Sequence, residues 1–463
     1  MNNQSFSDFP KWLSAHRLEP EQKFADSPWN TLGVDECRNP WFKDFGAVTH
    51  CSAFRRLAHK TQVHLNPQID FPRSRLTHSM EVSHISRQIV RAFCSIIKHP
   101  EPSFAQAFED ATATVCLAHD LGQPPFGHMA DEFLNGKLRE AGVGDGFEGN
   151  KQNLRVVCKT GVRPGLNLTA AVLDGLLKYK AQDIEIFKKK QGSFYSSERK
   201  IYLEVTDKTG TGTFRNPICA IMEASDDISY LSGDLEDACK FNVIGENEVG
   251  QIFHGLVGFD DAWREIKSKD GWIDLYRSCK PLGNFDPLKS AIIKPLIIHV
   301  LSELKAIWRF CDGDLNLLPK ILHEKLKPSE KDNKMNICYS NLESDKETGR
   351  IAKKIKDTLY SDYILKDKWL NETEFAAEKV LERLWSGLIP LAEQHDGPKA
   401  KKLKLMLPGY IQEKFKFFDD TGVHTPEERF RINADYISGM TDRYAIKMAA
   451  RLSGEAAFSH GWR

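Results

Sequence analysis

Apolar residues recur with helical spacing along most of the chain. In HSMEVSHISRQIVRAFCSII (78–97), the positions at steps of three and four are Val82, Ile85, Ile89, Phe93 and Ile96. This spacing places them on one face of an α-helix. A histidine, His78, stands at the head of the same face. The pattern therefore predicts a long helix that packs on the core and carries a histidine at its start.

Two further helices are predicted around ionisable residues. One begins near Ser103 and ends by Gly122, where two prolines follow, so that His119 and Asp120 fall in its last turn. The other covers 223–240, in which an aspartate or tyrosine recurs every four residues on one face: Asp226, Tyr230 and Asp234. Polar side chains that share a face in this way are candidates for a functional site.

The remaining patterns complete an all-α prediction with one exception. Residues 141–215 are richer in Gly, Lys and aromatics, and KKKQGSFYSSERKIYLEV (188–205) is predicted to form one small β-hairpin. The C-terminal third returns to helical spacing, most clearly in NADYISGMTDRYAIKMAARL, 433–452. The predicted fold is a helical bundle with additional helices and this hairpin.

Composition excludes several classes of protein. Lys plus Arg equals Asp plus Glu at 64 each, so no overall charge favours nucleic acid or a membrane surface. The ten cysteines form no CxxC pair, which argues against a zinc ribbon and a disulfide framework. The N-terminus lacks a basic and apolar leader, and no apolar run is long enough to cross a bilayer. We expect a cytoplasmic protein without a membrane partner.

The stretch LAHDLGQPPFGHMADE (117–132) carries the clearest chemistry. Divalent metals in proteins are held by imidazole and carboxylate ligands that converge from a rigid frame. His119 and Asp120 offer one of each, and His78 and a carboxylate of the third helix could complete the set. A His–Asp doublet alone is weak, because a histidine at a helix C-terminus or on an apolar face is commonly structural. Beyond the prolines, His128 and Asp131 are spaced to share one side of a helical turn.

Taken together, these segments resemble the HD-domain deoxynucleoside triphosphate triphosphohydrolases, the dGTPase-like branch of the HD-domain metal phosphohydrolases. The resemblance runs from about residue 38 to 455 and rests on these segments, in order: SAFRRLAHKTQV, SRLTHSMEV, LAHDLGQPPFGHMADE, the lysine-rich FYSSE segment, EASDDISYLSGDLEDA and DYISGMTDRYA. It implies an HD-domain helical bundle as the fold.

The resemblance also implies roles for individual residues. The family's metal ligands match His78, His119, Asp120 and Asp226. Asp226 is chosen over Asp227 because the family's metal aspartate lies four residues before the tyrosine, here Tyr230. The catalytic pair that approaches the α-phosphate matches His128 and its acidic partner Asp131. The residues that match the family's substrate-binding positions are Gln62, Tyr230 and Asp234 around the deoxyribose and Arg75 near the phosphates.

Two positions depart from the usual family pattern. Asp131 stands where many bacterial relatives have Glu, and Gln123 stands where His or Asn is more usual. Both residues keep hydrogen-bonding ability, so the departures bear on fine tuning and leave the reaction class unchanged.

The activity implied is metal-dependent hydrolysis of deoxynucleoside triphosphates, dGTP among them, to the deoxynucleoside and inorganic triphosphate. The cofactor is one divalent ion per site, and His and Asp ligands accept Mg²⁺, Mn²⁺, Co²⁺ or Fe²⁺. The family further implies a homo-oligomer, often a hexamer, and a nucleotide or single-stranded DNA as a candidate effector. We expect an N-terminal extension (1–37), a catalytic core (38–245, with an insertion at about 141–215) and a C-terminal helical region (246–463) that completes the nucleotide pocket and the oligomer contacts.

Two other functions remain open from the sequence. An HD phosphodiesterase or nucleotidase would act on another phosphate ester, and a regulator would bind nucleotide or single-stranded DNA with little turnover. The cationic stretch Lys188–Lys200 suits triphosphate, a neighbouring subunit, single-stranded nucleic acid or plain solvation. DYISGMTDRYA and Tyr360 could lie near the nucleotide, but buried aromatics at helical spacing usually belong to the core.

Overall fold

The computed structural model of the chain describes residues 8–19, 38–62, 73–99, 101–159, 165–180, 193–253, 269–326, 337–340, 342, 348–393, 397–421 and 425–455. Helices make up the regular structure of these residues, which otherwise contain only two isolated β-bridges. The all-α class is therefore confirmed. Among the described helices, none combines the length and the apolar character needed to span a bilayer.

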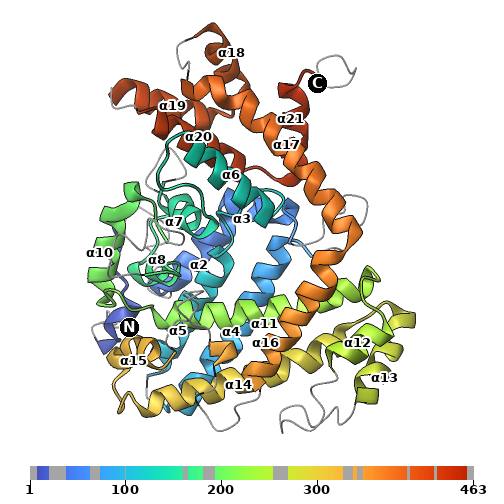
Figure 1. Cartoon of the computed structure of the whole chain (residues 1–463). Helices are drawn as coiled ribbons and strands as arrows, with labels where there is room; N and C mark the ends of the chain where they lie inside the picture. Colours follow the sequence, from blue (N-terminus) through green and yellow to red (C-terminus); the bar gives the residue numbers. More distant parts are fainter. Residues whose placement is uncertain are drawn as a thin grey trace.

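Figure 1 labels the helices in chain order. Their bounds are α2 (Pro40–His50), α3 (Ser52–Arg56), α4 (Arg75–Ile96), α5 (Pro102–Ala118), α6 (His128–Glu140), α7 (Gly149–Lys159), α8 (Ala170–Gly175), α10 (Arg199–Thr209), α11 (Pro217–Lys240), α12 (Glu246–Ile252), α13 (Lys269–Cys279), α14 (Asp286–Arg309), α15 (Leu318–Lys325), α16 (Thr348–Thr358), α17 (Lys368–Glu393), α18 (Pro398–Met406), α19 (Gly409–Thr421), α20 (Pro426–Ser438) and α21 (Asp442–Leu452). The short helical turns are η2 (Lys11–Leu13), η4 (Leu57–His59), η5 (Ser196–Glu198), η8 (Lys280–Leu282), η9 (Leu315–Leu317), η10 (Ile337–Tyr339), η11 (Leu359–Tyr363, a π-helical turn) and η12 (Ile364–Lys366).

Three long helices, α4, α5 and α11, pack against one another and form the frame of the candidate site (Figure 1). Ser74 caps α4 by accepting a hydrogen bond from the amide of Thr77, and Asn216 caps α11 in the same way from Ile218. The predicted apolar face of α4 is buried, with Val82 and Ile89 fully inaccessible. The helices predicted around 78–97 and 223–240 are thus confirmed.

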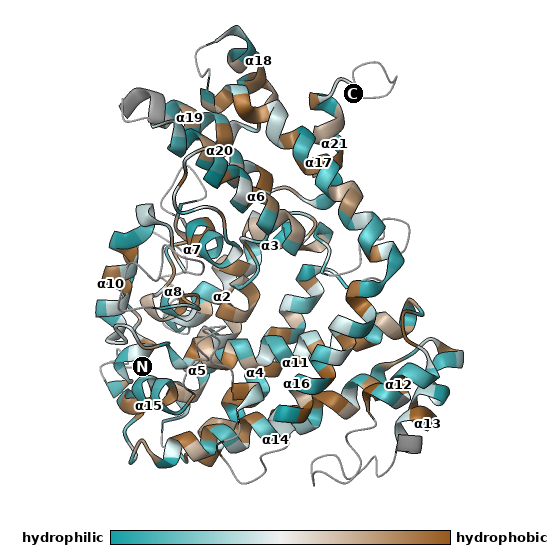
Figure 2. Cartoon of the chain, viewed as in Figure 1, coloured by the Kyte–Doolittle hydropathy of each residue, from teal (hydrophilic) through white to brown (hydrophobic). Residues whose placement is uncertain are grey.

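The molecule has two hydrophobic cores. The larger one extends in sequence from Trp12 to Leu370, so it includes the described part of the N-terminal extension. The second core joins α6 to α17, α18, α19, α20 and α21, which form the upper part of the molecule in Figure 1. Figure 2 shows brown and teal bands alternating along α17, as expected for a helix buried on one side.

The predicted hairpin at 188–205 is wrong in its described part. Residues 193–205 contain no strand, and α10 begins at Arg199. The buried side chains of α10 are Tyr202, Val205, Thr206 and Thr209, whose spacing is helical, so packing on one helix face overrides the short alternation that suggested a strand. Residues 188–192 lie outside the described residues.

Two helix boundaries also differ from the prediction. Helix α5 begins at Pro102 and ends at Ala118, so His119 is its C-terminal cap and Asp120 lies in the following turn. The segment 433–452 is divided between α20 and α21, because the chain leaves helical geometry after Ser438 and Thr441 caps a new helix.

Candidate metal centre and its surroundings

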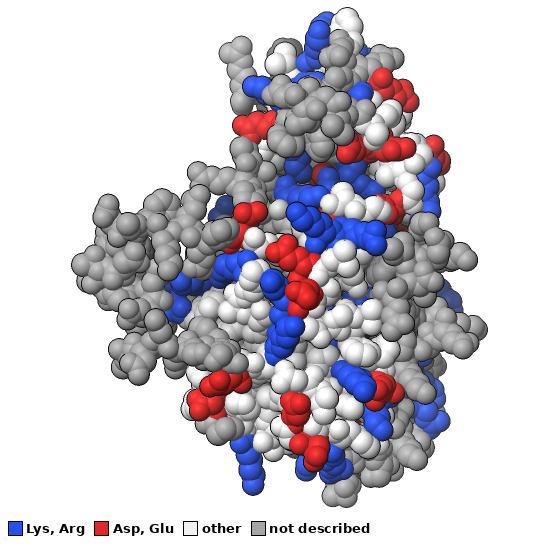
Figure 3. Space-filling model, turned by 90° about the vertical axis from the view of Figure 1, so that its left-hand side faces the viewer, with Lys and Arg blue, Asp and Glu red and all other residues white. Residues whose placement is uncertain are grey.

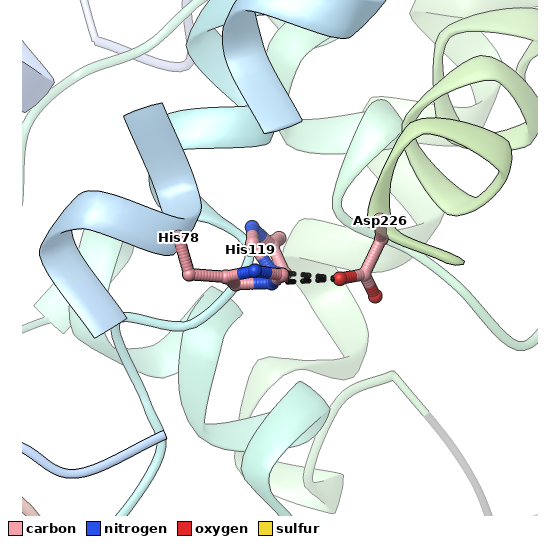
Figure 4. A group of neighbouring side chains, drawn as sticks. All are labelled: His78, His119 and Asp226. Atoms are coloured by element: carbon pink, nitrogen blue, oxygen red, sulfur yellow. Dashed lines mark hydrogen bonds and ion pairs between the residues drawn. The ribbon is translucent and has the colours of Figure 1, made fainter. Parts of the chain in front are cut away.

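His78 of α4, His119 at the C-terminal cap of α5 and Asp226 of α11 converge on one point. One potential ligand atom from each lies within 4.8 Å of the other two. Nε2 of His78 is 2.9 Å and Nε2 of His119 is 3.6 Å from the same carboxylate oxygen, Oδ1 of Asp226. Figure 4 shows both imidazoles directed at this carboxylate. Residues that are far apart in sequence are thus brought to one point.

The second ring nitrogen of each histidine has its own partner. Nδ1 of His119 lies 2.6 Å from the carbonyl oxygen of Cys116, so Nδ1 carries the proton and Nε2 keeps its lone pair. Nδ1 of His78 lies 3.3 Å from Oγ of Ser229, and that hydroxyl donates to Glu81 at 3.3 Å. These contacts orient both Nε2 atoms toward Asp226, as metal ligation requires.

Asp120 borders this group, but the structure does not place it in the group of three. Its Oδ1 lies 3.7 Å from Nε2 of His119, while its Oδ2 accepts a hydrogen bond of 2.7 Å from Arg75. Burial alone would raise the pKa of Asp120, but Arg75, followed by the two histidines, outweighs burial and lowers it. Arg75, expected near the phosphates, is thus held against a predicted metal ligand.

The donor set fits a divalent cation. Burial alone would raise the pKa of Asp226, but the neighbouring His119 and His78 outweigh it and hold the pKa well below its usual range. An ionised carboxylate beside two imidazole lone pairs is a suitable set of ligands for Mn²⁺, Fe²⁺, Co²⁺ or Mg²⁺. Asp227, the neighbour not chosen from the sequence, points elsewhere and forms an ion pair of 2.6 Å with Lys356.

Aromatic side chains lie beside the centre. The ring of Tyr230 makes an edge contact with His78, with 6.2 Å between centroids. Tyr230 stacks on Tyr360 at 5.3 Å with the planes only 6° apart, and the hydroxyl of Tyr360 donates to Asp234.

The side-chain oxygen of Gln62 is buried and has no hydrogen-bond partner among the described residues. An unpaired buried acceptor of this kind is suited to a ligand.

His128 and Asp131 both lie in the first turn of α6, directly after the GQPPFG linker. The imidazole of His128 is exposed, and Asp131 is half-buried and accepts a hydrogen bond from the amide of Gly149. Burial, reinforced by the negative charge of Glu148, raises the pKa of Asp131 to about 7. The predicted pair therefore starts one helix, as its spacing suggested.

The chain is similar to known proteins over most of its length. A family model described as the phosphohydrolase-associated domain matches residues 343–451. The deoxyguanosinetriphosphate triphosphohydrolase-like protein of Wolinella succinogenes is 27% identical over 94% of this chain and 99% of its own length. The chain is a relative of the deoxyguanosinetriphosphate triphosphohydrolase-like proteins. Those of Rickettsia bellii (28% identical, 89% of this chain and 90% of the relative) and Listeria monocytogenes (27%, 90% and 95%) show the same extent of similarity. The resemblance seen in the sequence is confirmed.

Two lysines that the sequence analysis did not single out also lie beside the candidate metal centre. Lys356, from the region that matches the phosphohydrolase-associated domain, pairs with Asp227 and lies 5.8 Å from the ring of Tyr230. Nζ of Lys178 lies 3.6 Å from Oε1 of Glu223. Burial alone would lower the pKa of Lys178, but Tyr179 and Glu223 outweigh burial and raise it. Neither lysine stands in a recognisable motif. For Lys356, the only signal in the sequence is the amphipathic spacing of α16.

The cationic stretch predicted at 188–200 is only partly described. Arg199 and Lys200 are exposed at the start of α10, whereas Glu198 is buried and pairs with Arg155 and Lys159. Figure 3 views the side of the molecule that carries α10 and shows acidic and basic side chains interspersed over it. This mixture is consistent with the zero net charge of the chain.

The contact between Ser229 and His78 gives a prediction about metal affinity. Ser229 and Glu81 line a cavity of about 520 Å³ between α4, α11 and α14, and they connect His78 to it. Ser229→Ala removes the acceptor that fixes the imidazole, so the affinity for Mn²⁺ should fall about tenfold by titration calorimetry. Ser232→Ala is the matched control, because the Ser232 hydroxyl bonds to the backbone of its own helix. Equal affinities of the two variants would contradict the role of Ser229.

Proposed function

We propose that the chain hydrolyses deoxynucleoside triphosphates, dGTP among them, to the deoxynucleoside and inorganic triphosphate. The observation that carries this proposal is the convergence of His78, His119 and Asp226 beside Tyr230. The names of the relatives, which are similar over nearly the whole chain, support the same substrate class.

The residues proposed to hold the ion are His78, His119, Asp120 and Asp226. A divalent ion held by them would neutralise phosphate oxygens and lower the pKa of a bound water. Arg75 keeps Asp120 ionised and presents a buried guanidinium next to that carboxylate. Lys178 and Lys356 lie near Asp226 and Asp227. Their positive charge would offset the repulsion between these carboxylates and a triphosphate.

The proton transfer is assigned to His128. Its imidazole is exposed at the start of α6, where it is accessible to a substrate. In the proposed step, water attacks the α-phosphorus and loses a proton to the solvent, the bond from phosphorus to the 5′-oxygen breaks, and His128 supplies a proton to that oxygen. Asp131, in the same turn, favours the protonated imidazole through its negative charge.

The deoxyribose is assigned to the aromatic side of the centre. Tyr230 and Tyr360 form a stacked pair, and Asp234 is held against Tyr360. Gln62 contributes its unpaired oxygen as an acceptor. A closely packed sugar edge disfavours ribonucleotides, because an added 2′-hydroxyl needs both space and a hydrogen-bond partner.

The test is to identify the products. The four dNTPs and GTP are incubated with the full chain and Mg²⁺, Mn²⁺, Co²⁺ or Fe²⁺, and products are separated by anion exchange. Inorganic triphosphate and deoxynucleoside are expected. Monophosphate or pyrophosphate would instead indicate a phosphodiesterase or nucleotidase. Absence of hydrolysis, together with salt-dependent binding of single-stranded DNA, would indicate a regulator.

The pKa of Asp131 gives a prediction about pH. Because burial and Glu148 raise this pKa to about 7, the carboxylate forms only as the pH rises through that value. If the carboxylate keeps His128 protonated, kcat should rise with pH with a midpoint near pH 7 and fall again at the pH where His128 loses its proton. Glu148→Gln removes the negative neighbour and should move the midpoint to lower pH, while its amide oxygen still accepts from Lys151. An unchanged midpoint in the Glu148→Gln variant would contradict this coupling.

A further inference from the structure

The DYISGMTDRYA segment makes contacts that its sequence did not explain. Asp442, the first residue of α21, is buried, with 6% of its surface exposed. Its Oδ2 accepts from the amide of Thr61 at 2.8 Å and from the hydroxyl of Thr61 at 2.6 Å. Its Oδ1 accepts from the amide of Phe126 at 3.0 Å. One carboxylate therefore joins the residue before Gln62 to the linker that precedes His128.

The hydrogen bond from Phe126 to Asp442 lies in a part of the linker with unusual backbone geometry. Pro124 and Pro125 have no amide hydrogen, so Phe126 provides the first backbone donor after them. Phe126 has φ of +66° and Gly127 has φ of +76°. Left-handed geometry is unfavourable for Phe, so the surrounding structure must hold it there. The hydrogen bond to Asp442 supplies such a restraint.

A buried lysine holds the other end of the same linker. Nζ of Lys60 donates to the carbonyl oxygen of Gln123 at 2.5 Å and to that of Ser438 at 2.7 Å. Lys60 directly precedes Thr61, and Ser438 ends α20, so both contacts join the same three segments as Asp442 does. The linker is thereby held at both of its ends, on either side of the two prolines.

From these contacts we infer that Asp442 is a positioning residue for the proposed reaction: it sets Gln62 and His128 relative to each other, with Lys60 as its partner. This inference rests on the proposed function and adds a residue to it. Asp442 acts through the backbone of the two segments, and the substrate contacts remain those of Gln62 and His128. The phosphohydrolase-associated region would then contribute to turnover by holding the linker as well as through Tyr360.

The chain contains a matched control for this arrangement. Asp44 is buried and accepts from the amide of Thr169 at 2.8 Å and from its hydroxyl at 2.7 Å, as Asp442 does from Thr61. Its other oxygen accepts from Arg17. Asp44 lies on α2, and neither Thr169 nor Arg17 belongs to the proposed site. Asp44→Asn therefore removes the same kind of carboxylate acceptor at a position whose hydrogen-bond partners lie outside the proposed site.

The kinetic test compares Asp442→Asn with Asp44→Asn in the full chain. The side chain of Asn has one acceptor oxygen in place of two, so the hydrogen bonds to either Thr61 or Phe126 are lost. Asp442→Asn should lower kcat/KM for dGTP about tenfold, through KM if the Thr61 contact is the one lost and through kcat if it is the Phe126 contact. Asp44→Asn should leave both within about twofold per folded molecule. Thr61→Val should raise KM and leave kcat near that of the parent, because the Phe126 contact persists, and Thr61→Ser should restore KM.

Amide hydrogen exchange tests the same inference without turnover. In Asp442→Ala, the amides of Thr61 and Phe126 should exchange at least about tenfold faster, while those in the middle of α11 should not change. If the parent chain releases no triphosphate, the proposed function fails, and the exchange result still decides whether Asp442 holds both segments. Unchanged KM and kcat in Asp442→Asn, or unchanged exchange at Phe126, would overturn the inference.

Discussion

Asp226→Ala is expected to abolish metal-dependent release of triphosphate, with a loss of about 10³-fold or more in kcat/KM. The carboxylate of Asp226 is the only group that contacts both histidine Nε2 atoms among the described residues. Without it, two imidazoles remain with an aspartate that is already paired with Arg75. The measurement is Mn²⁺ titration calorimetry alongside product analysis, and both metal affinity and turnover should be lost.

Asp227→Ala is the matched control for that experiment. It removes the adjacent carboxylate on the same helix, but Asp227 pairs with Lys356 and does not face the histidines. Its metal affinity should stay close to that of the parent, although KM can change through Lys356. If Asp226→Ala binds Mn²⁺ and turns over normally, the assignment of the metal centre is wrong.

His128→Ala should lower kcat by about 10²- to 10⁴-fold while Mn²⁺ affinity is retained, because general acid catalysis contributes that range and His128 lies outside the ligand group. The exposed His84 of α4 offers a control, since its ring bonds to Gln88 on the next turn of the same helix. His84→Ala should leave kcat and metal affinity unchanged. Loss of Mn²⁺ binding in His128→Ala would instead place His128 among the ligands.

The sequence predicted those parts of the site that depend on local spacing. The apolar face of α4 identified a helix with His78 at its start, and the four-residue spacing in α11 placed Asp226, Tyr230 and Asp234 on one face. The structure agrees because each pattern lies within a single helix, where geometry follows from residue number. The choice between Asp226 and Asp227 came from the family resemblance, and the observed contacts are consistent with it.

Contacts between distant segments were less predictable. The sequence offered Tyr360 only as a candidate near the nucleotide, because its stacking on Tyr230 depends on the tertiary fold that brings η11 to α11. Lys356 and Asp442 are likewise joined to their partners by the tertiary fold. The hairpin prediction failed for a related reason, since packing on one face of α10 outweighed local β-propensity.

The second hydrophobic core has a consequence for any attempt to shorten the protein. The apolar side of α6, formed by Ala130, Leu134 and Leu138, is covered by residues beyond 380. A fragment that stopped before α17 would leave this side in water and remove the support on which α6 rests. The chain from α17 onward is therefore needed by the rest of the protein: a fragment limited to the first four-fifths or so of the chain would keep the proposed ligands for an ion but lose the packing that holds the helix of the proposed proton donor.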